Sequence, residues 1–335
     1  MDLSRFPRRA YTTGPTPIQR LDRFSRALGP GGPTVYIKRD DLLGLAGGGN
    51  KTRKLEFLVA DALAKGADTL ITCGGVQSNH CRLTLSAAAV EGLRCRLVLA
   101  EMAPGEYRPD GAGNVQLYHL LGAERIITIP WGADQGEALE QAAEEARSEG
   151  RRPYPIPLGG SVPLGALGYA VCARELLGQA RESGLEFHHV LLSVGSTGTL
   201  AGLLLGLGEE PRPIPVTAVS VLRPRETAEA AARDLLRATA ALLGDAPEIP
   251  AERVVCLDDY VGPGYAQPTP GMLKAVALLA RTEGILLDPT YTGKAMAGLI
   301  DLVRRGQFRE GENVLFLHTG GAPGLFAHPE LFPGA

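Results

Sequence analysis

Short apolar segments alternate with longer amphipathic segments along most of the chain. Such alternation predicts β-strands separated by α-helices, and therefore parallel sheets wrapped by helices. The predicted strands are residues 35–38, 69–73, 96–100, 125–129, 154–156, 189–193, 215–221 and 313–318, and the clearest predicted helices are residues 51–65, 80–91, 114–121 and 133–148. The hydrophobic pattern thus indicates an α/β fold.

The length of the chain and one unusual stretch suggest how that fold is divided. At 335 residues the chain has room for two domains, since one domain typically takes roughly 100–200 residues. Residues 151–165 carry Pro153, Pro155, Pro157 and Pro163 among several glycines. Helix and strand interiors tolerate such a composition poorly. We expect this stretch to be a crossover between domains.

The charge balance gives no indication of a highly charged partner. The formal net charge is −3, so we expect no long-range attraction to nucleic acid or to an anionic membrane. Residues 1–9 lack the apolar core of a signal peptide, and no stretch approaches the roughly 18 apolar residues of a membrane span. These features predict a cytoplasmic protein without a nucleic-acid or membrane partner.

The cysteines do not form a recognisable framework. There are five of them, dispersed and without a Cys-x-x-Cys pair, at positions 73, 81, 95, 172 and 256. An odd number without close pairs predicts neither a disulfide scaffold nor a zinc site. We expect small buried apolar side chains and no metal site.

A glycine run places Lys51 at the start of a predicted helix. Gly47-Gly48-Gly49 precedes Asn50-Lys51-Thr52-Arg53-Lys54. Glycines leave room for another group to approach the backbone, and the first turn of a helix presents free N–H groups and a positive dipole end that suit an anion. The same field, with Arg53 and Lys54 nearby, is expected to favour the neutral Lys51 amine, the form that attacks carbonyl groups.

A second glycine-lined turn carries a hydroxyl and an amide, in Gly74-Gly75-Val76-Gln77-Ser78-Asn79-His80. Together the two turns resemble the pyridoxal-phosphate enzymes of the tryptophan-synthase-β fold type. Within these they are similar to the branch that holds D-cysteine desulfhydrase and 1-aminocyclopropane-1-carboxylate (ACC) deaminase. Two later segments also fit: Ser193-Val194-Gly195-Ser196-Thr197-Gly198-Thr199-Leu200-Ala201-Gly202 and Leu287-Asp288-Pro289-Thr290-Tyr291-Thr292-Gly293-Lys294-Ala295-Met296. The likeness runs from about Thr16 to the turn His318-Thr319-Gly320-Gly321.

The resemblance implies an overall architecture. It predicts a fold type II enzyme with two domains of twisted, mostly parallel sheets flanked by helices. Residues 1–53 plus 157–335 would form the larger, cofactor-binding domain, and residues 54–156 the smaller α/β domain. Pyridoxal 5'-phosphate would lie in the cleft between them, and the family suggests a homodimer.

Pyridoxal phosphate needs a lysine, a phosphate cradle and partners for its ring oxygen and ring nitrogen. The resemblance implies Lys51 as the Schiff-base lysine; Lys294 is a rival in another glycine-bearing turn, at a position where the family does not have that lysine. Ser196, Thr197, Gly198 and Thr199 open a predicted helix, where successive N–H groups and hydroxyls form an anion-binding nest. An ordinary helix cap needs only one such hydroxyl. Lys54, one turn beyond Lys51, is expected to add positive charge to the phosphate.

The remaining roles also follow from the resemblance. Asn79 is expected to bind the phenolate oxygen of the ring. Ser78 is expected to place its hydroxyl over the substrate, with a plain helix cap as the alternative. Tyr291 and Tyr265 match active-site tyrosines of the family that act as acid or base, or that anchor the substrate carboxylate. For the ring nitrogen, the segments that fit the family offer the hydroxyls of Thr292 and Thr319, and no carboxylate lies in the turn 318–321.

Thr292 decides the predicted reaction. In ACC deaminases the residue after the tyrosine is Glu, and in D-cysteine desulfhydrases it is Thr. A neutral hydroxyl leaves the ring nitrogen largely unprotonated, which favours expulsion of a good leaving group. The favoured prediction is therefore β-elimination of D-cysteine, a small amino-acid substrate, to pyruvate, hydrogen sulfide and ammonia. Three alternatives stay open: ACC deaminase giving 2-oxobutanoate and ammonia, a lyase on another β-substituted amino acid such as cysteate, and a non-catalytic pyridoxal-phosphate-binding protein.

Overall fold

The computed structural model describes residues 1–332 and contains two β-sheets. The larger sheet has the order β1 (Ile18–Arg20), β2 (Thr34–Lys38), β10 (Asn313–Leu317), β7 (His189–Val194), β8 (Val216–Ser220) and β9 (Val255–Leu257). The smaller sheet has the order β5 (Arg125–Pro130), β4 (Arg94–Glu101), β3 (Thr69–Gly75) and β6 (Pro153–Ile156). Neighbouring strands run parallel except β1 and β2. The predicted α/β fold with mostly parallel sheets is confirmed.

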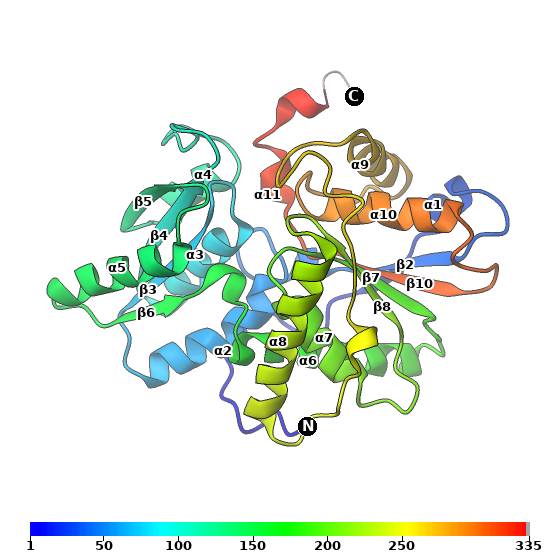
Figure 1. The fold of residues 1–335 in the computed structure, drawn as a ribbon, viewed down its shortest axis with the longest axis horizontal. Helices are drawn as coiled ribbons and strands as arrows, with labels where there is room; N and C mark the ends of the chain where they lie inside the picture. Colours follow the sequence, from blue (N-terminus) through cyan, green and yellow to red (C-terminus); the bar gives the residue numbers. More distant parts are fainter. Residues whose placement is uncertain (333–335) are drawn as a thin grey trace.

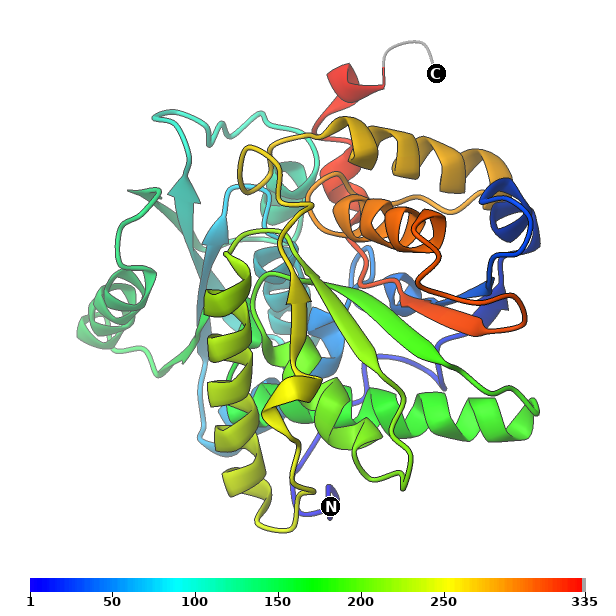
Figure 2. The same cartoon turned by 45° about the vertical axis from the view of Figure 1, so that its right-hand side comes forward.

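Helices cover both faces of the larger sheet, because its strands carry apolar side chains on both sides. Along β10, Val314 and Phe316 join one core while Leu315 and Leu317 join the other. The first core includes α1 (Asp22–Ala27), α9 (Pro270–Glu283) and α10 (Thr292–Arg304), and the second includes α6 (Pro163–Glu182), α7 (Gly198–Leu207) and α8 (Arg225–Leu243). Figure 2 shows β7, β8 and β10 between these two groups of helices.

The smaller sheet is covered in the same way. α5 (Gln135–Ser148) packs on one face, and α2 (Lys51–Ala64), α3 (Asn79–Glu91) and α4 (Asn114–Leu120) pack on the other. α2 contributes Leu58 to this core and Phe57 to a core of the larger sheet. Helix α2 therefore lies between the two sheets, as Figure 1 shows.

The turns that carry the predicted site residues lie at the carboxyl ends of the central strands. β3 ends at Gly75 before the turn to α3, β7 ends at Val194 before the turn to α7, and β10 ends at Leu317 before a turn to the short α11 (Ala322–Leu325). In open parallel sheets, ligands bind outside these ends. The two sheets therefore present their loops to a common region.

Some elements differ from the sequence prediction. The sequence pattern did not predict the edge strands β1 and β9. Each spans only three residues, which are too few to show an alternating pattern. The predicted crossover 151–165 contains β6, a 3₁₀ turn at Leu158–Gly160 and the start of α6, where Pro163 occupies the first turn, a position that suits proline. The domain boundaries themselves stay a prediction.

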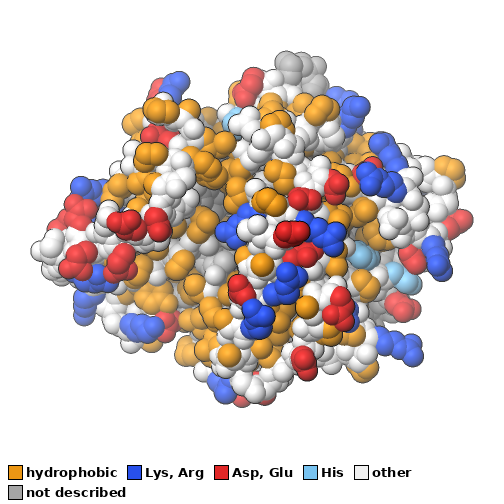
Figure 3. All heavy atoms as spheres, viewed as in Figure 1, with side chains coloured by type: hydrophobic (Ala, Val, Ile, Leu, Met, Phe, Trp, Pro, Cys, Tyr) orange, Lys and Arg blue, Asp and Glu red, His pale blue; other side chains and the backbone are white. Residues whose placement is uncertain are grey.

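The surface is mixed in charge. Figure 3 shows positive and negative side chains interspersed over the face turned to the viewer. Among residues 1–332, no helix is both long and apolar enough to cross a membrane.

Candidate active site

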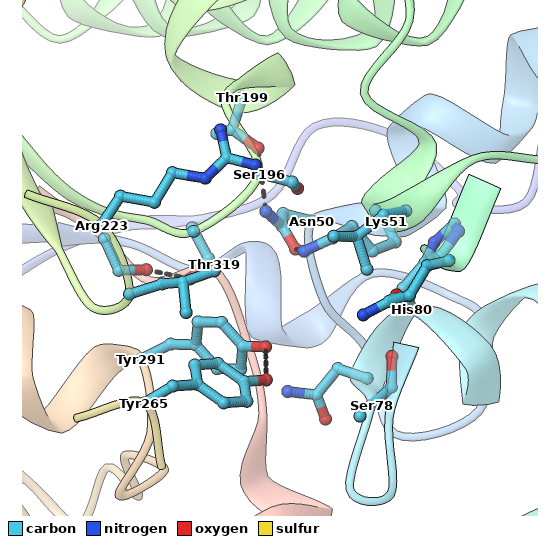
Figure 4. A pocket seen from close by; sticks show the side chains of 18 of the residues that line it. Asn50, Lys51, Ser78, His80, Ser196, Thr199, Arg223, Tyr265, Tyr291 and Thr319 are labelled. Atoms are coloured by element: carbon cyan, nitrogen blue, oxygen red, sulfur yellow. Dashed lines mark hydrogen bonds between the residues drawn. The ribbon is translucent and has the colours of Figure 1, made fainter. Parts of the chain in front are cut away.

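One cavity of about 290 Å³ collects side chains from both sheets and is called the main cavity below. It lies at the carboxyl ends of the strands and is shown in Figure 4. Eight of the predicted site residues line it: Lys51, Ser78, Asn79, Ser196, Thr199, Tyr265, Tyr291 and Thr319. Four others, Lys54, Thr197, Gly198 and Thr292, do not.

The glycine run before Lys51 packs directly on the turn that follows β10. Gly320 has φ +87°, and a Cβ atom there would lie 2.5 Å from the Cα of Gly49. The N–H of Asn50 donates to the carbonyl of Thr319 across this contact at 3.0 Å. Larger residues would separate the two turns, so the glycines fix Lys51 at the first position of α2, facing the main cavity.

Among residues 1–332, no carboxylate forms an ion pair with the Lys51 amine. Its Nζ donates to Asn50 Oδ1 at 2.9 Å, and Asn50 Nδ2 in turn donates to Thr199 Oγ1 at 2.9 Å. Burial lowers the pKa of Lys51 to about 8, and the positive charge of Arg82 acts in the same direction. A substantial fraction of the amine is therefore neutral near pH 8.

Of the two basic neighbours that the sequence named as a cause of this lowered pKa, Arg53 does not act on Lys51, whereas the Lys51 and Lys54 amines do influence each other. Arg53 points to the other side of α2, where it forms ion pairs with Asp40 at 2.8 Å and Glu175 at 2.8 Å. These carboxylates neutralise its charge. Arg82, one turn into α3, is the arginine that raises the potential at Lys51.

Only part of the predicted phosphate cradle, residues 196–199, lines the main cavity. Ser196 and Thr199 face the main cavity, whereas the N–H of Gly198 donates to Ser161 Oγ at 3.1 Å. Thr197 Oγ1 is directed to the carbonyl of Ala231 at 3.4 Å. The N–H of Gly198 is thus occupied, and the other N–H groups in the first turn of α7 are those left for an anion.

Lys54 also lies behind the cavity. Its Nζ donates to the carbonyl of Gly159 and to Ser161 Oγ, both at 3.1 Å. Burial and the nearby Lys51 hold the pKa of Lys54 well below its usual range. Lys54 therefore holds the 159–161 loop against α7. Its Nζ also lies beside the start of α7, since a Cβ atom at Gly198 would be 2.9 Å from it, and the expected contribution of its charge to the phosphate stays a prediction.

Arg223 is a lining residue that the sequence did not reveal. It follows β8, and the hydroxyl of Ser220 fixes its backbone by accepting from its N–H at 3.1 Å and donating to its carbonyl at 2.6 Å. Within residues 1–332 its guanidinium has no ion-pair or hydrogen-bond partner. In Figure 4 the side chain extends toward Ser196 and Thr199. Its place at the carboxyl end of a parallel strand was the available signal.

Asn79 is held in a defined orientation. Its Oδ1 accepts from Arg82 Nη1 at 2.6 Å and from Asn114 Nδ2 at 3.1 Å. With the oxygen occupied in this way, the amide N–H₂ is the end left for a ligand in the main cavity. The neighbouring Ser78 caps α3, because its Oγ accepts from the N–H of Cys81 at 3.2 Å, and it lines the cavity as well. Ser78 is therefore a helix cap, and its expected place over the substrate stays a prediction that its position in the cavity lining allows.

Tyr265 and Tyr291 form a hydroxyl pair on the opposite wall. Their hydroxyl groups are hydrogen-bonded to each other, and the Lys51 Nζ lies 5.9 Å from the centre of the Tyr291 ring. Burial raises the pKa of Tyr265 to about 12 and raises that of Tyr291 as well. Both hydroxyls are therefore protonated near neutral pH. One of the two hydroxyl protons forms the hydrogen bond between the tyrosines, and the other is available for a hydrogen bond to a ligand.

The expected ring-nitrogen partner Thr292 is directed away from the main cavity. Its fully buried hydroxyl donates to Asp288 Oδ1 at 2.7 Å and accepts from the Asp288 N–H at 2.9 Å. Thr319 does line the cavity, where its hydroxyl lies 3.1 Å from that of Ser193. Thr292 therefore does not present its hydroxyl to the main cavity, as the predicted contact with the ring nitrogen would require, whereas Thr319 and Ser193 do line that cavity.

Lys294 is likewise engaged elsewhere. Its Nζ donates to the carbonyls of Val261 at 2.7 Å and Gly264 at 2.9 Å, and it is not part of the lining. It thus supports the loop that carries Tyr265. Within residues 1–332, no group of three or more His, Cys, Asp or Glu side chains is placed to hold a metal ion.

Comparisons with known proteins show which family the chain is similar to. A family model described as "Pyridoxal-phosphate dependent enzyme" matches residues 10–320. The 1-aminocyclopropane-1-carboxylate deaminase of Burkholderia cenocepacia is 45% identical over 99% of both chains, and that of Methylobacterium nodulans is 42% identical over 96% of this chain and 97% of its own.

Solved structures give the same picture. A crystal structure described as an ACC deaminase homologue has a TM-score of 0.84 at 41% identity and covers 98% of this chain and 96% of its own. O-ureido-L-serine synthase shares the fold, with a TM-score of 0.67 at 21% identity over 97% and 95% of the two chains.

Proposed function

We propose, from the premise that the chain belongs to the family of pyridoxal-phosphate-dependent enzymes, that it releases ammonia from a small α-amino acid, with 1-aminocyclopropane-1-carboxylate as the substrate. Relatives that bear the name of this activity, at 42–45% identity over nearly the whole chain, support the choice of substrate over the D-cysteine favoured by the sequence. The observation that carries the proposal is the Lys51 amine, with its lowered pKa, in one cavity with the Tyr265–Tyr291 hydroxyl pair.

The charge of the main cavity fits the cofactor. Lys51 and Arg223 line it, and none of the described lining residues is Asp or Glu. A phosphate group and a substrate carboxylate would supply the missing negative charge. Lys51 would attach the cofactor, Ser196, Thr199 and Arg223 with the start of α7 would hold its phosphate, the Asn79 amide its phenolate oxygen, and Thr319 its ring nitrogen. When bound, pyridoxal phosphate withdraws electrons from the substrate α-carbon and weakens the bonds around it.

The chain's own groups supply the proton transfers. The neutral Lys51 amine accepts a proton, and the Tyr265–Tyr291 pair carries one that it can donate to a substrate carbon or carboxylate. Ser78 offers a hydroxyl on the α3 side of the cavity. Overall, ACC and one water give 2-oxobutanoate and ammonia.

A second candidate is the β-elimination of D-cysteine, which with one water gives pyruvate, hydrogen sulfide and ammonia. The absence of Asp and Glu among the described lining residues favours it. The cavity-lining hydroxyls of Ser193 and Thr319 cannot protonate the ring nitrogen as a carboxylic acid would, and a weaker electron sink suits a good leaving group such as hydrosulfide.

The two candidates are separated by their products. Purified holoenzyme is incubated with ACC, D-cysteine, L-cysteine, D-serine and cysteate at one subsaturating concentration, and 2-oxobutanoate, pyruvate and ammonia are measured. The proposal requires 2-oxobutanoate from ACC at a higher rate than pyruvate from any other substrate. If pyruvate forms from D-cysteine faster than 2-oxobutanoate forms from ACC, the first proposal is wrong and the second candidate takes its place.

Two further expectations belong to the proposal. The enzyme is expected to be a homodimer, which size-exclusion chromatography with light scattering measures. It is also expected in the cytoplasm, which cell fractionation measures.

A further inference from the structure

A second cavity of about 260 Å³, called the side cavity below, adjoins the main one. The two share Gly75, Trp131 and Tyr265 in their linings. Among the residues that line only the side cavity are Val76, Ala100, Met102, Ala103 and Glu106. A ligand that extended past Tyr265 would therefore enter this space.

Two stacked aromatic rings separate the cavities. The rings of Trp131 and Tyr265 lie 5.1 Å apart between centroids with an interplanar angle of 13°. They lean over Gly75, where a Cβ atom would meet Tyr265 Cε1 at 3.6 Å and Trp131 Cζ3 at 3.8 Å. Trp131 follows β5 of the smaller sheet and Tyr265 lies on a loop that precedes α9, so the pair bridges the two halves of the molecule.

The two rings are anchored unequally. Tyr265 is hydrogen-bonded to Tyr291, and Lys294 holds its loop through the carbonyl of Gly264 at 2.9 Å. Trp131 is fixed through its backbone, whose N–H donates to the carbonyl of Glu101 at 2.8 Å, and its residue surface is 37% exposed. Gly132 follows it with φ +94°. Of the two stacked rings, Trp131 is therefore the one whose side chain is held by fewer contacts and the better position for a substitution.

We propose that Trp131 sets the size of substrate that the enzyme accepts, and that the side cavity is a subsite for the substituent of larger β-substituted amino acids. This inference rests on the proposed release of ammonia from amino acids and adds a second class of substrate. The lining of the side cavity combines the apolar Val76, Ala100 and Ala103 with polar side chains, and the Glu106 carboxylate disfavours an anion. The subsite therefore suits uncharged thioether substituents, such as the benzyl group of S-benzylcysteine.

The reaction of such a substrate is an elimination. The Lys51 amine takes the proton from the α-carbon, the electron pair of that bond forms a double bond between the α- and β-carbons, and the bond between the β-carbon and sulfur breaks. Sulfur leaves with the bonding electrons and takes a proton to give benzyl thiol. One water then releases the remaining carbon skeleton as pyruvate and ammonia. No oxidant or reductant is needed.

The test compares wild type with Trp131→Ala and Trp131→Phe as holoenzymes. Binding of S-benzylcysteine, in D and L form, and of D-cysteine is measured from the change in cofactor absorbance, which does not require turnover. We expect Trp131→Ala to shift the ratio of the two dissociation constants toward S-benzylcysteine by about tenfold or more, since a pocket discriminates by this much between substituents of different size. Trp131→Phe, which keeps a ring in the partition, should shift it much less.

A double variant locates the effect in the side cavity. Met102 lines only that cavity, so Trp131→Ala combined with Met102→Trp should refill it and cancel the gain. An unchanged ratio in Trp131→Ala, or a gain that persists in the double variant, overturns the subsite. Failure of wild type to release ammonia from any amino acid contradicts the proposed function instead, and the binding ratios still decide the subsite.

Discussion

Arg223 offers the sharpest test of how the cofactor phosphate is held. Its guanidinium lines the main cavity, has no partner within residues 1–332, and extends toward Ser196 and Thr199 (Figure 4). Arg223→Met keeps most of the side-chain length and removes the charge. A hydrogen bond between charged groups contributes about 1.5–3 kcal/mol. Because Arg223 is only half-buried, we expect about 1.5–2 kcal/mol, which is a 10- to 30-fold rise in the dissociation constant.

The assay titrates apo-protein with pyridoxal phosphate and, separately, with pyridoxal, which lacks the phosphate. Arg223→Met should weaken binding of pyridoxal phosphate and leave pyridoxal unaffected. The matched control is Arg225→Met, because Arg225 lies two residues later, pairs with Glu229 at 2.9 Å and does not line the cavity. Equal losses for both ligands, or no loss for either, would refute a phosphate contact.

Three other predictions address Lys51, Thr199 and the ring-nitrogen partners. With a Lys51 pKa of about 8, covalent attachment of the cofactor to apo-protein should become faster as the pH rises to about 8 and level off above it, because only the neutral amine attacks. Borohydride trapping measures the rate of attachment. A midpoint of the rate-against-pH curve near pH 10 would contradict the lowered pKa. Thr199→Val should weaken cofactor retention by about 1–3 kcal/mol, measured by dialysis and absorbance, and unchanged retention places the phosphate elsewhere. Thr292→Val should lower the free energy of unfolding, measured in urea, by about 1–3 kcal/mol and leave the absorption spectrum of the bound cofactor unchanged. Thr319→Val should instead shift that spectrum. The opposite pattern would restore Thr292 as the partner of the ring nitrogen.

The sequence predicted features that depend on local pattern. Short, nearly continuous apolar runs located the central strands, since β3 and β10 are buried on both faces. The glycine runs located Lys51 and Ser78, because close approach of two turns leaves no room for side chains, and a Cβ at Gly74 would lie 2.4 Å from Ser78 Oγ.

Features that depend on individual side-chain partners could not be predicted in this way. Lys54 donates to Ser161, which is far away in the sequence, and the hydroxyl of Thr292 is held by Asp288 in the irregular turn before α10. Neither partnership follows from helix spacing. Trp131 and Arg223 line the site from loops whose positions are set by the packing of both sheets. The sequence therefore identified the turns of the site more reliably than the direction of individual side chains.

The attachment point of the cofactor tests the account most directly. The holoenzyme is reduced with borohydride and digested with trypsin, and the modified peptide is identified by mass spectrometry. We predict modification in the peptide 40–53, which contains Lys51, and none after reduction of Lys51→Ala. Modification of Lys294, in the peptide 282–304, or of Lys54 would contradict the assignment of the main cavity as the cofactor site.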